Sequence, residues 1–378
     1  MSGISFGLAD VLVFATALAV SVVVTPLVRN FAVRRRIGNK PNGRDAHRDA
    51  IPHLGGIALF LGVATAMTVA LLRENSLTVT GALLVRSAPA LLLIVVLGLV
   101  DDTRSLPARR KLAFQLLASA SVVAVGFRLF TGMWVFDAAT VSLLVVSLVF
   151  IVGMLSSVNL VDGHDGLAAG VTMLSAVAFA VVGAMMGLPE VVALALATGG
   201  ACLGFLVFNF PPGRIYMGDT GSMLLGLVLS LAACLISMRA PSVNTFAAVC
   251  LALGVPLLDT MLAIARRVVL RSPLFGADRL HMHHVLRDAG LSPRRTLMVL
   301  YAMQAFFSLL GVGAAMGWML PVIVGLGFVT VAFVSFLRMM VEGRETPETI
   351  PHRAVPNTIP FQSSFSTNIP ERRTSVGR

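Results

Sequence analysis

Charged side chains are scarce in this chain of 378 residues. Only 12% of its residues are Asp, Glu, Lys or Arg, whereas soluble globular proteins carry about 25%. Hydrophobic residues make up 57% of the chain, and the mean hydropathy is +0.89. This composition argues against a soluble domain. Long apolar runs instead predict an all-α polytopic membrane protein.

Cysteine is also rare. Cys202, Cys234 and Cys250 each lie in an apolar run, and no two are close enough to form a CxxC pair. This argues against a disulfide framework or a Cys-rich zinc site, so we interpret the three residues as small hydrophobic side chains within helices. The first apolar run has no basic segment before it, so it is expected to be a span rather than a cleavable signal peptide.

Apolar runs near the ~20 residues that a bilayer core requires occur eleven times. The predicted spans are 8–28, 53–72, 83–100, 112–130, 139–156, 166–186, 192–209, 221–238, 245–265, 296–314 and 319–338. Pro89 and Pro256 fall inside spans, where neighbouring helices can satisfy the freed carbonyls. We expect a membrane domain over 1–339. A disordered cytoplasmic tail, rich in Pro, Ser, Thr and Arg, is expected over 340–378.

Basic residues are divided unequally between the two faces of this layout. One face receives 25 of the 29 Lys and Arg residues. The positive-inside rule makes that face cytoplasmic, with the N-terminus outside and the C-terminus inside. The net charge of +11 then follows from topology and requires no nucleic-acid partner. A basic face also favours anionic lipid and phosphate-bearing substrates.

The stretch from Asn159 to Leu167 places three ionisable groups and two glycines between two apolar runs on this face. Asn159, Asp162 and Asp165 are spaced three apart, so a helical turn would put them on one side. Amide and carboxylate oxygens suit Mg²⁺. The alternative is a polar connector, because Asx-Gly pairs often form turns.

Two further clusters on this face combine cations with carboxylates. The first loop contains Lys40, Arg44 and His47, which could hold a phosphate or could serve only as a topogenic basic loop. Asp101 and Asp102 end the third span. Adjacent carboxylates repel each other, so they are easiest to keep beside a cation. This cation could be a metal or one of the basic residues Arg104, Arg109, Arg110 and Lys111.

The last two clusters each precede a span or lie between spans. Asp219 stands in Gly-Asp-Thr-Gly-Ser, as a metal ligand or as a plain N-cap. The second cluster supplies one guanidinium and three imidazoles, from Arg279, His281, His283 and His284. Its N–H groups suit a diphosphate-sugar. Zinc fits less well without cysteine, and a structural loop is the remaining alternative.

Carboxylates for Mg²⁺ and cations for phosphate at one membrane face predict phosphoryl transfer to a lipid acceptor. A transporter is the main competing hypothesis, and it would place charged residues near mid-bilayer along a path. A catalytically inactive scaffold would have lost Asp101, Asp219 or a motif histidine.

These five motifs, in this order over about 40–290, resemble those of the polyprenyl-phosphate N-acetylhexosamine-1-phosphate transferases. The same superfamily includes the phospho-MurNAc-pentapeptide translocase. The eleven-span layout is similar to the GlcNAc-1-phosphate branch. Three positions depart from the family pattern: Ser156 replaces an Asn, His164 replaces an apolar residue, and Met282 replaces an Ile.

The resemblance implies that undecaprenyl phosphate attacks the sugar-bearing β-phosphate of a UDP-N-acetylhexosamine. UMP leaves, and undecaprenyl-diphosphate-sugar forms on the cytoplasmic side of a bacterial inner membrane. We expect GlcNAc as the sugar, with GalNAc and MurNAc-pentapeptide as alternatives. The implied partners are therefore undecaprenyl phosphate, the UDP-sugar and membrane lipid, and a homodimer is allowed.

The resemblance also implies residue roles. Asn159 and Asp219 would bind Mg²⁺, or Mn²⁺, while Asp162 and Asp165 would contact the nucleotide. Asp101 and Asp102 would orient or deprotonate the lipid phosphate, or organise the metal. We favour positioning, because a phosphate monoester already has a second pKa near ~6. The diphosphate or sugar would be held by Arg279, His281, His283 and His284. The lipid phosphate would be held by Lys40, Arg44 and His47.

Overall fold

The computed structural model describes residues 6–35, 37, 51–73, 79–129, 138–271 and 280–345. Every regular element in these residues is an α-helix. The chain divides into one compact unit over 1–333 and a second unit over 334–378. The last helix extends to Glu345, into the first residues of the predicted tail, and 346–378 lie outside the described residues.

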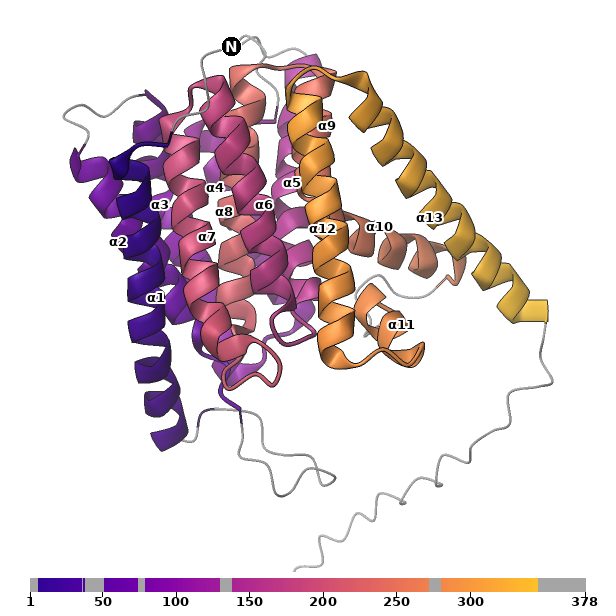
Figure 1. Ribbon diagram of the computed structural model, residues 1–378, viewed down its shortest axis with the longest axis horizontal. Helices are drawn as coiled ribbons and strands as arrows, with labels where there is room; N and C mark the ends of the chain where they lie inside the picture. Colours follow the sequence, from indigo (N-terminus) through magenta and orange to yellow (C-terminus); the bar gives the residue numbers. More distant parts are fainter. Residues whose placement is uncertain are drawn as a thin grey trace, which may run out of the picture. The chain divides into compact units, whose positions relative to one another are not determined.

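Thirteen helices make up the described part of the chain (Figure 1). The first seven are α1 (Leu8–Arg34), α2 (Gly55–Arg73), α3 (Val79–Arg104), α4 (Ala108–Val125), α5 (Ala138–Val161), α6 (Leu167–Met186) and α7 (Pro189–Asn209). The other six are α8 (Gly218–Arg239), α9 (Val243–Ala252), α10 (Gly254–Val269), α11 (Met282–Asp288), α12 (Pro293–Ala315) and α13 (Met319–Glu345).

Nine of these helices are long and apolar enough to cross a membrane: α1, α2, α3, α5, α6, α7, α8, α12 and α13. The pair α9 and α10 would make a tenth span if it crosses as one bent unit. The described residues thus form a polytopic membrane protein with nine or ten such spans. The fourth predicted span, over 112–130, corresponds to α4, which falls outside this set because three cations, at 109–111, stand in its first turn.

The predicted span over 245–265 is not one straight helix. The helix breaks at Leu253, and the axes of α9 and α10 are bent by 86°. The cause is local, because proline has no N–H and its ring clashes with the carbonyl four residues earlier. Pro256 therefore frees the carbonyl of Ala252, and Gly254 beside it weakens the helix further.

Gln304 of α12 forms hydrogen bonds with backbone groups on both sides of this break. Its Nε2 donates to the Ala252 carbonyl at 2.8 Å, and its Oε1 accepts from the Val255 N–H at 3.0 Å. Gln304 is fully buried. A buried glutamine thus replaces the backbone bonds that the proline removes, and it fixes the point at which α10 turns away from α9.

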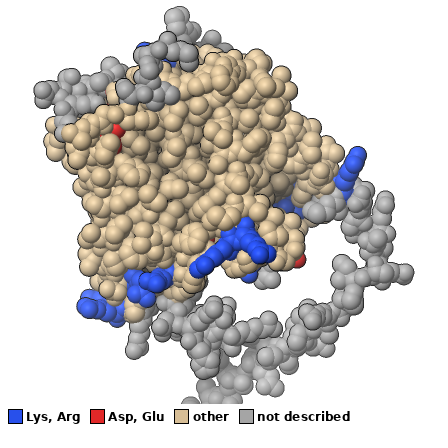
Figure 2. All heavy atoms as spheres, in the orientation of Figure 1, with Lys and Arg blue, Asp and Glu red and all other residues tan. Residues whose placement is uncertain are grey.

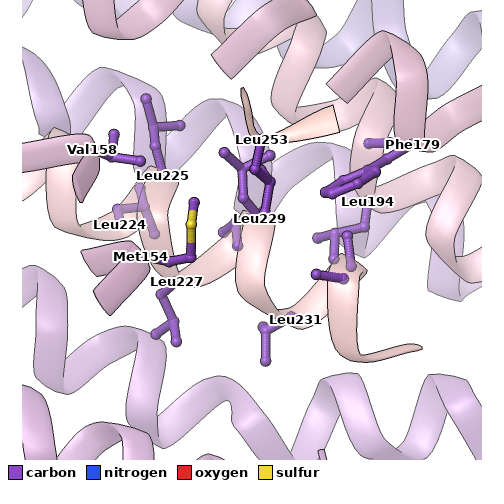
Figure 3. Packing of buried hydrophobic residues seen from close by; sticks show 14 of the residues in the cluster. Met154, Val158, Phe179, Leu194, Leu224, Leu225, Leu227, Leu229, Leu231 and Leu253 are labelled. Carbon is purple, nitrogen blue, oxygen red and sulfur yellow. The ribbon is translucent and has the colours of Figure 1, made fainter. Parts of the chain in front are cut away.

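The core is built around α8. This helix packs against α2, α3, α5, α6 and α7, and nearly all of its residues are buried. In Figure 3, Met154 and Val158 of α5 lie beside Leu224 and Leu225 of α8. Because α8 is surrounded by these five helices, its first turn, which carries Asp219, is enclosed by them.

The chain passes back and forth so that the carboxyl ends of α3, α5 and α7 meet the amino ends of α4, α6 and α8 (Figure 1). Figure 2 shows Lys and Arg gathered mainly at the lower end of the same view, below a broad belt of uncharged surface. The polar motifs of the sequence occupy the connections at these helix ends, so the fold brings them together.

Candidate active site

The first turn of α8 is held by a carboxylate from α3. Asp102 Oδ1 accepts from the Asp219 N–H at 2.7 Å. Its Oδ2 accepts from the N–H of Thr220 at 3.1 Å and from the Thr220 hydroxyl at 2.7 Å. Asp102 therefore caps a helix with no cap from its own chain segment. These contacts hold the backbone of Asp219, the predicted metal ligand, in place.

Gly218 makes this arrangement possible. Its φ is +69°, which an L side chain rarely adopts, and a Cβ there would lie 2.3 Å from the His53 carbonyl oxygen. The segment containing His53 runs alongside, because Gly55 N–H donates to the Tyr216 carbonyl at 2.9 Å. The end of the first polar loop thus joins the Gly218–Ser222 motif.

Lys111 of α4 links two of the predicted carboxylates. Its Nζ lies 2.7 Å from Asp101 Oδ2 and also bonds Asp219 Oδ2. Asp101 Oδ1 accepts from the Leu106 N–H, which folds the α3–α4 connection around this point. The nearby cation that adjacent carboxylates require is therefore Lys111.

Asn159, at the end of α5, completes the cluster. Its Nδ2 donates to Asp219 Oδ1 at 2.8 Å and to the Ser222 hydroxyl at 2.9 Å. Four helices, α3, α4, α5 and α8, thus place Asp101, Lys111, Asn159 and Asp219 in direct contact. We call these four residues the carboxylate cluster.

Asp162 and Asp165 lie in the turn after α5, not on a continued helical face as the spacing predicted. Burial raises the pKa of Asp162 well above its ordinary value, and the charges of Asp219 and Asp102 raise it further. Asp165 Oδ2 accepts from the Gly213 N–H at 2.8 Å. Asp162 therefore interacts with the carboxylate cluster, whereas Asp165 anchors the α7–α8 connection.

The His motif packs against the same turn. A Cβ at Gly163 would lie 2.8 Å from His283 Nε2, so only glycine admits the ring at this distance. Burial, and then the neighbouring His284, lower the pKa of His283 to about 4. The His283 ring is thus neutral at neutral pH and contributes hydrogen-bonding groups rather than charge.

Asp259 of α10 orients the first histidine of this motif. Its Oδ2 lies 2.8 Å from His281 Nδ1, and its Oδ1 accepts from the Met282 N–H at 2.8 Å. The Asp259 and His281 side chains are 4% and 6% exposed. Arg266 Nη1 also donates to the Leu280 carbonyl at 3.0 Å. Residues of α10 therefore hold the start of α11 in place.

Two hollows adjoin these residues. An apolar groove of about 460 Å³ runs between α4, α5 and α10, with Lys111 and Asn159 in its wall. A smaller polar pocket of about 270 Å³ lies at the α5–α6 turn. The residues that line the polar pocket are His53, Asp162, Gly163, His164, Asp165, Asn209 and Tyr216.

The donor chemistry of the carboxylate cluster fits a divalent cation. Asn159 and Asp219 offer amide and carboxylate oxygens, which Mg²⁺ prefers. The one ammonium that bridges Asp101 and Asp219 carries a single positive charge, which does not balance these two carboxylates. Among the described residues, no three His, Cys, Asp or Glu side chains form a metal-binding group by themselves.

Comparison with known proteins agrees with this geometry. Residues 84–237 match the model of glycosyl transferase family 4. The chain is 35% identical over 324 residues to a decaprenyl-phosphate N-acetylglucosaminephosphotransferase of Mycolicibacterium smegmatis, covering 77% of this chain and 78% of that one. The chain belongs to glycosyl transferase family 4.

Two other relatives bear related names. An undecaprenyl-phosphate alpha-N-acetylglucosaminyl 1-phosphate transferase of Thermotoga maritima is 28% identical over 300 residues, covering 77% of this chain and 87% of that one. A phospho-N-acetylmuramoyl-pentapeptide-transferase of Moorella thermoacetica is 31% identical over 320 residues, covering 78% and 95%. The resemblance seen in the motifs is thus confirmed at the level of the family.

The family match contains the carboxylate cluster and the α5–α6 turn, while the His motif lies beyond it. Four residues predicted to contact substrate lie outside the described residues: Lys40, Arg44, His47 and Arg279. The structure brings the other predicted residues to one end of the molecule. These are Asp101, Asp102, Asn159, Asp162, Asp165, Asp219, His281, His283 and His284.

Asp259 was absent from the predicted site, and Lys111 was expected only as one of several basic residues that could neutralise Asp101 and Asp102. Two signals in the sequence pointed to them. Lys40 and Lys111 are the two lysines of a chain whose other basic residues are all arginine, which suggests a specific need for a compact ammonium. Asp259 falls inside a predicted span, where an ionisable residue is by default a functional candidate.

Proposed function

We propose that this family 4 protein transfers N-acetylglucosamine-1-phosphate from UDP-GlcNAc to undecaprenyl phosphate. The products are undecaprenyl-diphosphate-GlcNAc and UMP. The observation that carries the proposal is the carboxylate cluster, which lies beside an apolar groove and adjoins a polar, histidine-lined pocket through Asp162. This arrangement suits one lipid phosphate and one nucleotide-sugar.

The acceptor belongs in the apolar groove. Leu106, Leu112, Leu160 and Ile264 provide an apolar wall for isoprene units. Lys111 lies in the same wall, and two of its three N–H donors bond Asp101 and Asp219, which leaves the third for a terminal phosphate. A phosphate monoester is largely ionised near pH 7, so an oxygen of the acceptor can attack without a strong base. The main contribution of this wall is then that Lys111 positions the acceptor phosphate.

The donor belongs on the side of the polar pocket. Asp162 and Asp165 face the nucleotide there, and His283 reaches the same turn through Gly163. His281, His283 and His284 then lie beside the diphosphate and sugar. The acceptor oxygen forms a bond to the β-phosphorus, and the bond from that phosphorus to the oxygen bridging the α-phosphate breaks. UMP carries away the bond's electrons.

Asn159 and Asp219 are the residues that would hold Mg²⁺, with Mn²⁺ as the alternative. The bound ion would neutralise charge on the transferring phosphates. Asp102 keeps Asp219 in place by capping α8. Asp101 shares Lys111 with Asp219 and so sets the position of the ammonium group.

The proposed enzyme lies in a bacterial inner membrane with its active site on the cytoplasmic side. Eleven spans, counting α4 and the bent pair α9–α10, put the N-terminus outside and the C-terminus inside. The distribution of Lys and Arg supports this orientation. The fourteen residues of α4 that follow its cations carry no charge, which supports a crossing by this helix.

The test uses purified full-length protein in detergent with undecaprenyl phosphate and radiolabelled UDP-GlcNAc. Label should enter the lipid fraction with release of one UMP per transfer, and EDTA should stop the reaction until Mg²⁺ is restored. Asp219→Asn should lower kcat by at least about 100-fold, in line with the loss of one electrostatic group in an active site. Circular dichroism should show an unchanged fold.

Parallel reactions with UDP-GalNAc and UDP-MurNAc-pentapeptide identify the donor. Label from one of these and none from UDP-GlcNAc would retain the chemistry and replace the sugar. No transfer from any of the three by folded protein would refute the transferase proposal. Wild-type turnover by Asp219→Asn would refute the metal assignment alone.

A further inference from the structure

His164 occupies the centre of the α5–α6 turn, where the family pattern has an apolar residue. Its Nδ1 lies 3.0 Å from the carbonyl oxygen of Asp165. A carbonyl can only accept, so Nδ1 must carry the proton of this hydrogen bond. In the neutral ring, Nε2 is then left with a lone pair and acts as an acceptor.

The Nε2 atom of His164 is buried and has no hydrogen-bond partner among the described residues. The ring lines the polar pocket of about 270 Å³. On its other side it meets the His283 ring edge-on, with the two ring centres 6.2 Å apart. Leaving a buried acceptor unsatisfied costs about 1–3 kcal/mol. A ligand that enters this pocket and donates a hydrogen bond would remove this cost.

We propose that His164 Nε2 accepts a hydrogen bond from the nucleoside of the donor and thereby helps to select it. This inference rests on the proposed function, which places the nucleotide beside Asp162 and Asp165. Ionised phosphates have no hydrogen to donate, so an acceptor in this pocket does not recognise the diphosphate. The nucleoside offers the base N3–H and the ribose 2′-hydroxyl, and these share the required chemistry.

His164 shares this property with His53, whose Nε2 is also buried without a partner among the described residues, but it differs from Asp165 and Asn209. Asp165 Oδ2 is bonded to the Gly213 N–H, and Asn209 bonds the Gly166 N–H and the Ile215 carbonyl. Those side chains hold the surrounding connections together. The His164 ring is oriented through Nδ1, and its buried Nε2 has no partner among the described residues, so a donor that reaches this atom meets an oriented acceptor.

The experiment compares three donors in the transfer assay. They are UDP-GlcNAc, its N3-methyluridine analogue and its 2′-deoxyuridine analogue. Wild-type kcat/KM should fall about 3- to 10-fold for whichever analogue lacks the donated hydrogen, the usual worth of one hydrogen bond. His164→Leu should use UDP-GlcNAc as poorly as wild type uses that analogue, and it should no longer distinguish the two donors.

Two further variants separate the acceptor from the shape of the side chain. In His164→Gln, the side-chain oxygen can reach the position of Nε2, so discrimination between donor and analogue should return. In His164→Asn, the amide can replace Nδ1 in the bond to Asp165 but has nothing at Nε2, so discrimination should be lost while the turn is kept. His164→Asn also serves if His164→Leu does not fold.

Equal discrimination by wild type, His164→Leu and His164→Asn would overturn the proposal, as would a wild type that does not distinguish either analogue from UDP-GlcNAc. A uniform loss for all three donors in both variants would do the same, because it would indicate a contact with the diphosphate or a structural effect. Absence of turnover with UDP-GlcNAc in wild type would refute the proposed function instead, so the two failures are distinguishable.

Discussion

At the scale of single residues, the site depends on Lys111. The carboxylates of Asp101 and Asp219 both contact its ammonium group, and Lys111 comes from α4, 108 residues before Asp219. An arginine would present a planar fork with a wider charge, whereas lysine offers a compact point charge. One lysine can therefore bridge two carboxylates and also face the apolar groove where an acceptor phosphate would lie.

Replacing Lys111 by Met should lower kcat by about 100-fold or more. The Met side chain keeps most of the volume and removes the charge, so Asp101 and Asp219 repel each other and the acceptor phosphate loses its partner. Steady-state kinetics in detergent measures this effect. The matched control is Arg110→Met, one residue earlier on α4 and exposed, which should stay within about 3-fold of wild type.

A Lys111→Met variant with near wild-type kcat would contradict the role given to this residue. Titration of Mg²⁺ adds a second readout. The variant should require a different Mg²⁺ concentration for half-maximal rate, because the neighbouring ammonium no longer competes for Asp219. Arg110→Met should leave the Mg²⁺ dependence unchanged.

The residues that the sequence could identify are those with unusual chemistry for a membrane protein. Asn159, Asp162, Asp165 and Asp219 stood out because carboxylates and amides beside apolar runs are rare. What the sequence could not show was their pairing. The contacts of Asp219 with Asn159 and Lys111 span 60 and 108 residues, and no local pattern encodes such distances.

At the scale of elements, the bend between α9 and α10 determines where the His motif lies. A continuous span would have carried Asp259 deep into the membrane. The bend instead lets Asp259 reach His281 and the first N–H of α11. The sequence prediction treated Pro256 as tolerated inside one span and did not anticipate the bend. The decisive partner, Gln304, lies about 50 residues later in α12.

Removing the Asp259 side chain should disconnect α10 from α11. In Asp259→Ala, the buried Met282 N–H and His281 Nδ1 lose their acceptor, which should destabilise the protein by about 1–3 kcal/mol. The donor KM should rise several-fold while the acceptor KM changes little, because the His motif lies on the donor side. Thermal unfolding and kinetics with each substrate varied in turn measure the two effects.

Asp259→Asn is the matched variant for this prediction. Its side-chain oxygen still accepts from the Met282 N–H, while its amide meets His281 Nδ1 as a donor and favours the opposite tautomer of the ring. Stability should therefore lie between wild type and Asp259→Ala. An equal rise in KM for donor and acceptor in both variants would contradict the assignment of the His motif to the donor.

At the scale of the whole molecule, hydropathy predicted most of the helices because lipid imposes one simple rule on length and polarity. It could not decide α4, in which three cations precede fourteen uncharged residues. Contacts of α4 with α3 and α5 place it within the helical assembly, and Lys111 gives its charged end a role in the site. The charge that weakens α4 as a span is thus part of the proposed chemistry.

Cysteine labelling tests both the crossing by α4 and the orientation of the protein. In a variant without its native cysteines, Arg104→Cys before α4 and Thr131→Cys after it should react from opposite sides with a membrane-impermeant maleimide. Val243→Cys, 77% exposed at the start of α9, should react in right-side-out vesicles. Ala289→Cys, exposed after α11, should react only after permeabilisation.

Labelling of Arg104→Cys and Thr131→Cys from one side would make α4 a re-entrant or interfacial helix and leave ten spans. Labelling of Ala289→Cys in sealed right-side-out vesicles would place the His motif outside, where a cytoplasmic UDP-sugar could not reach it.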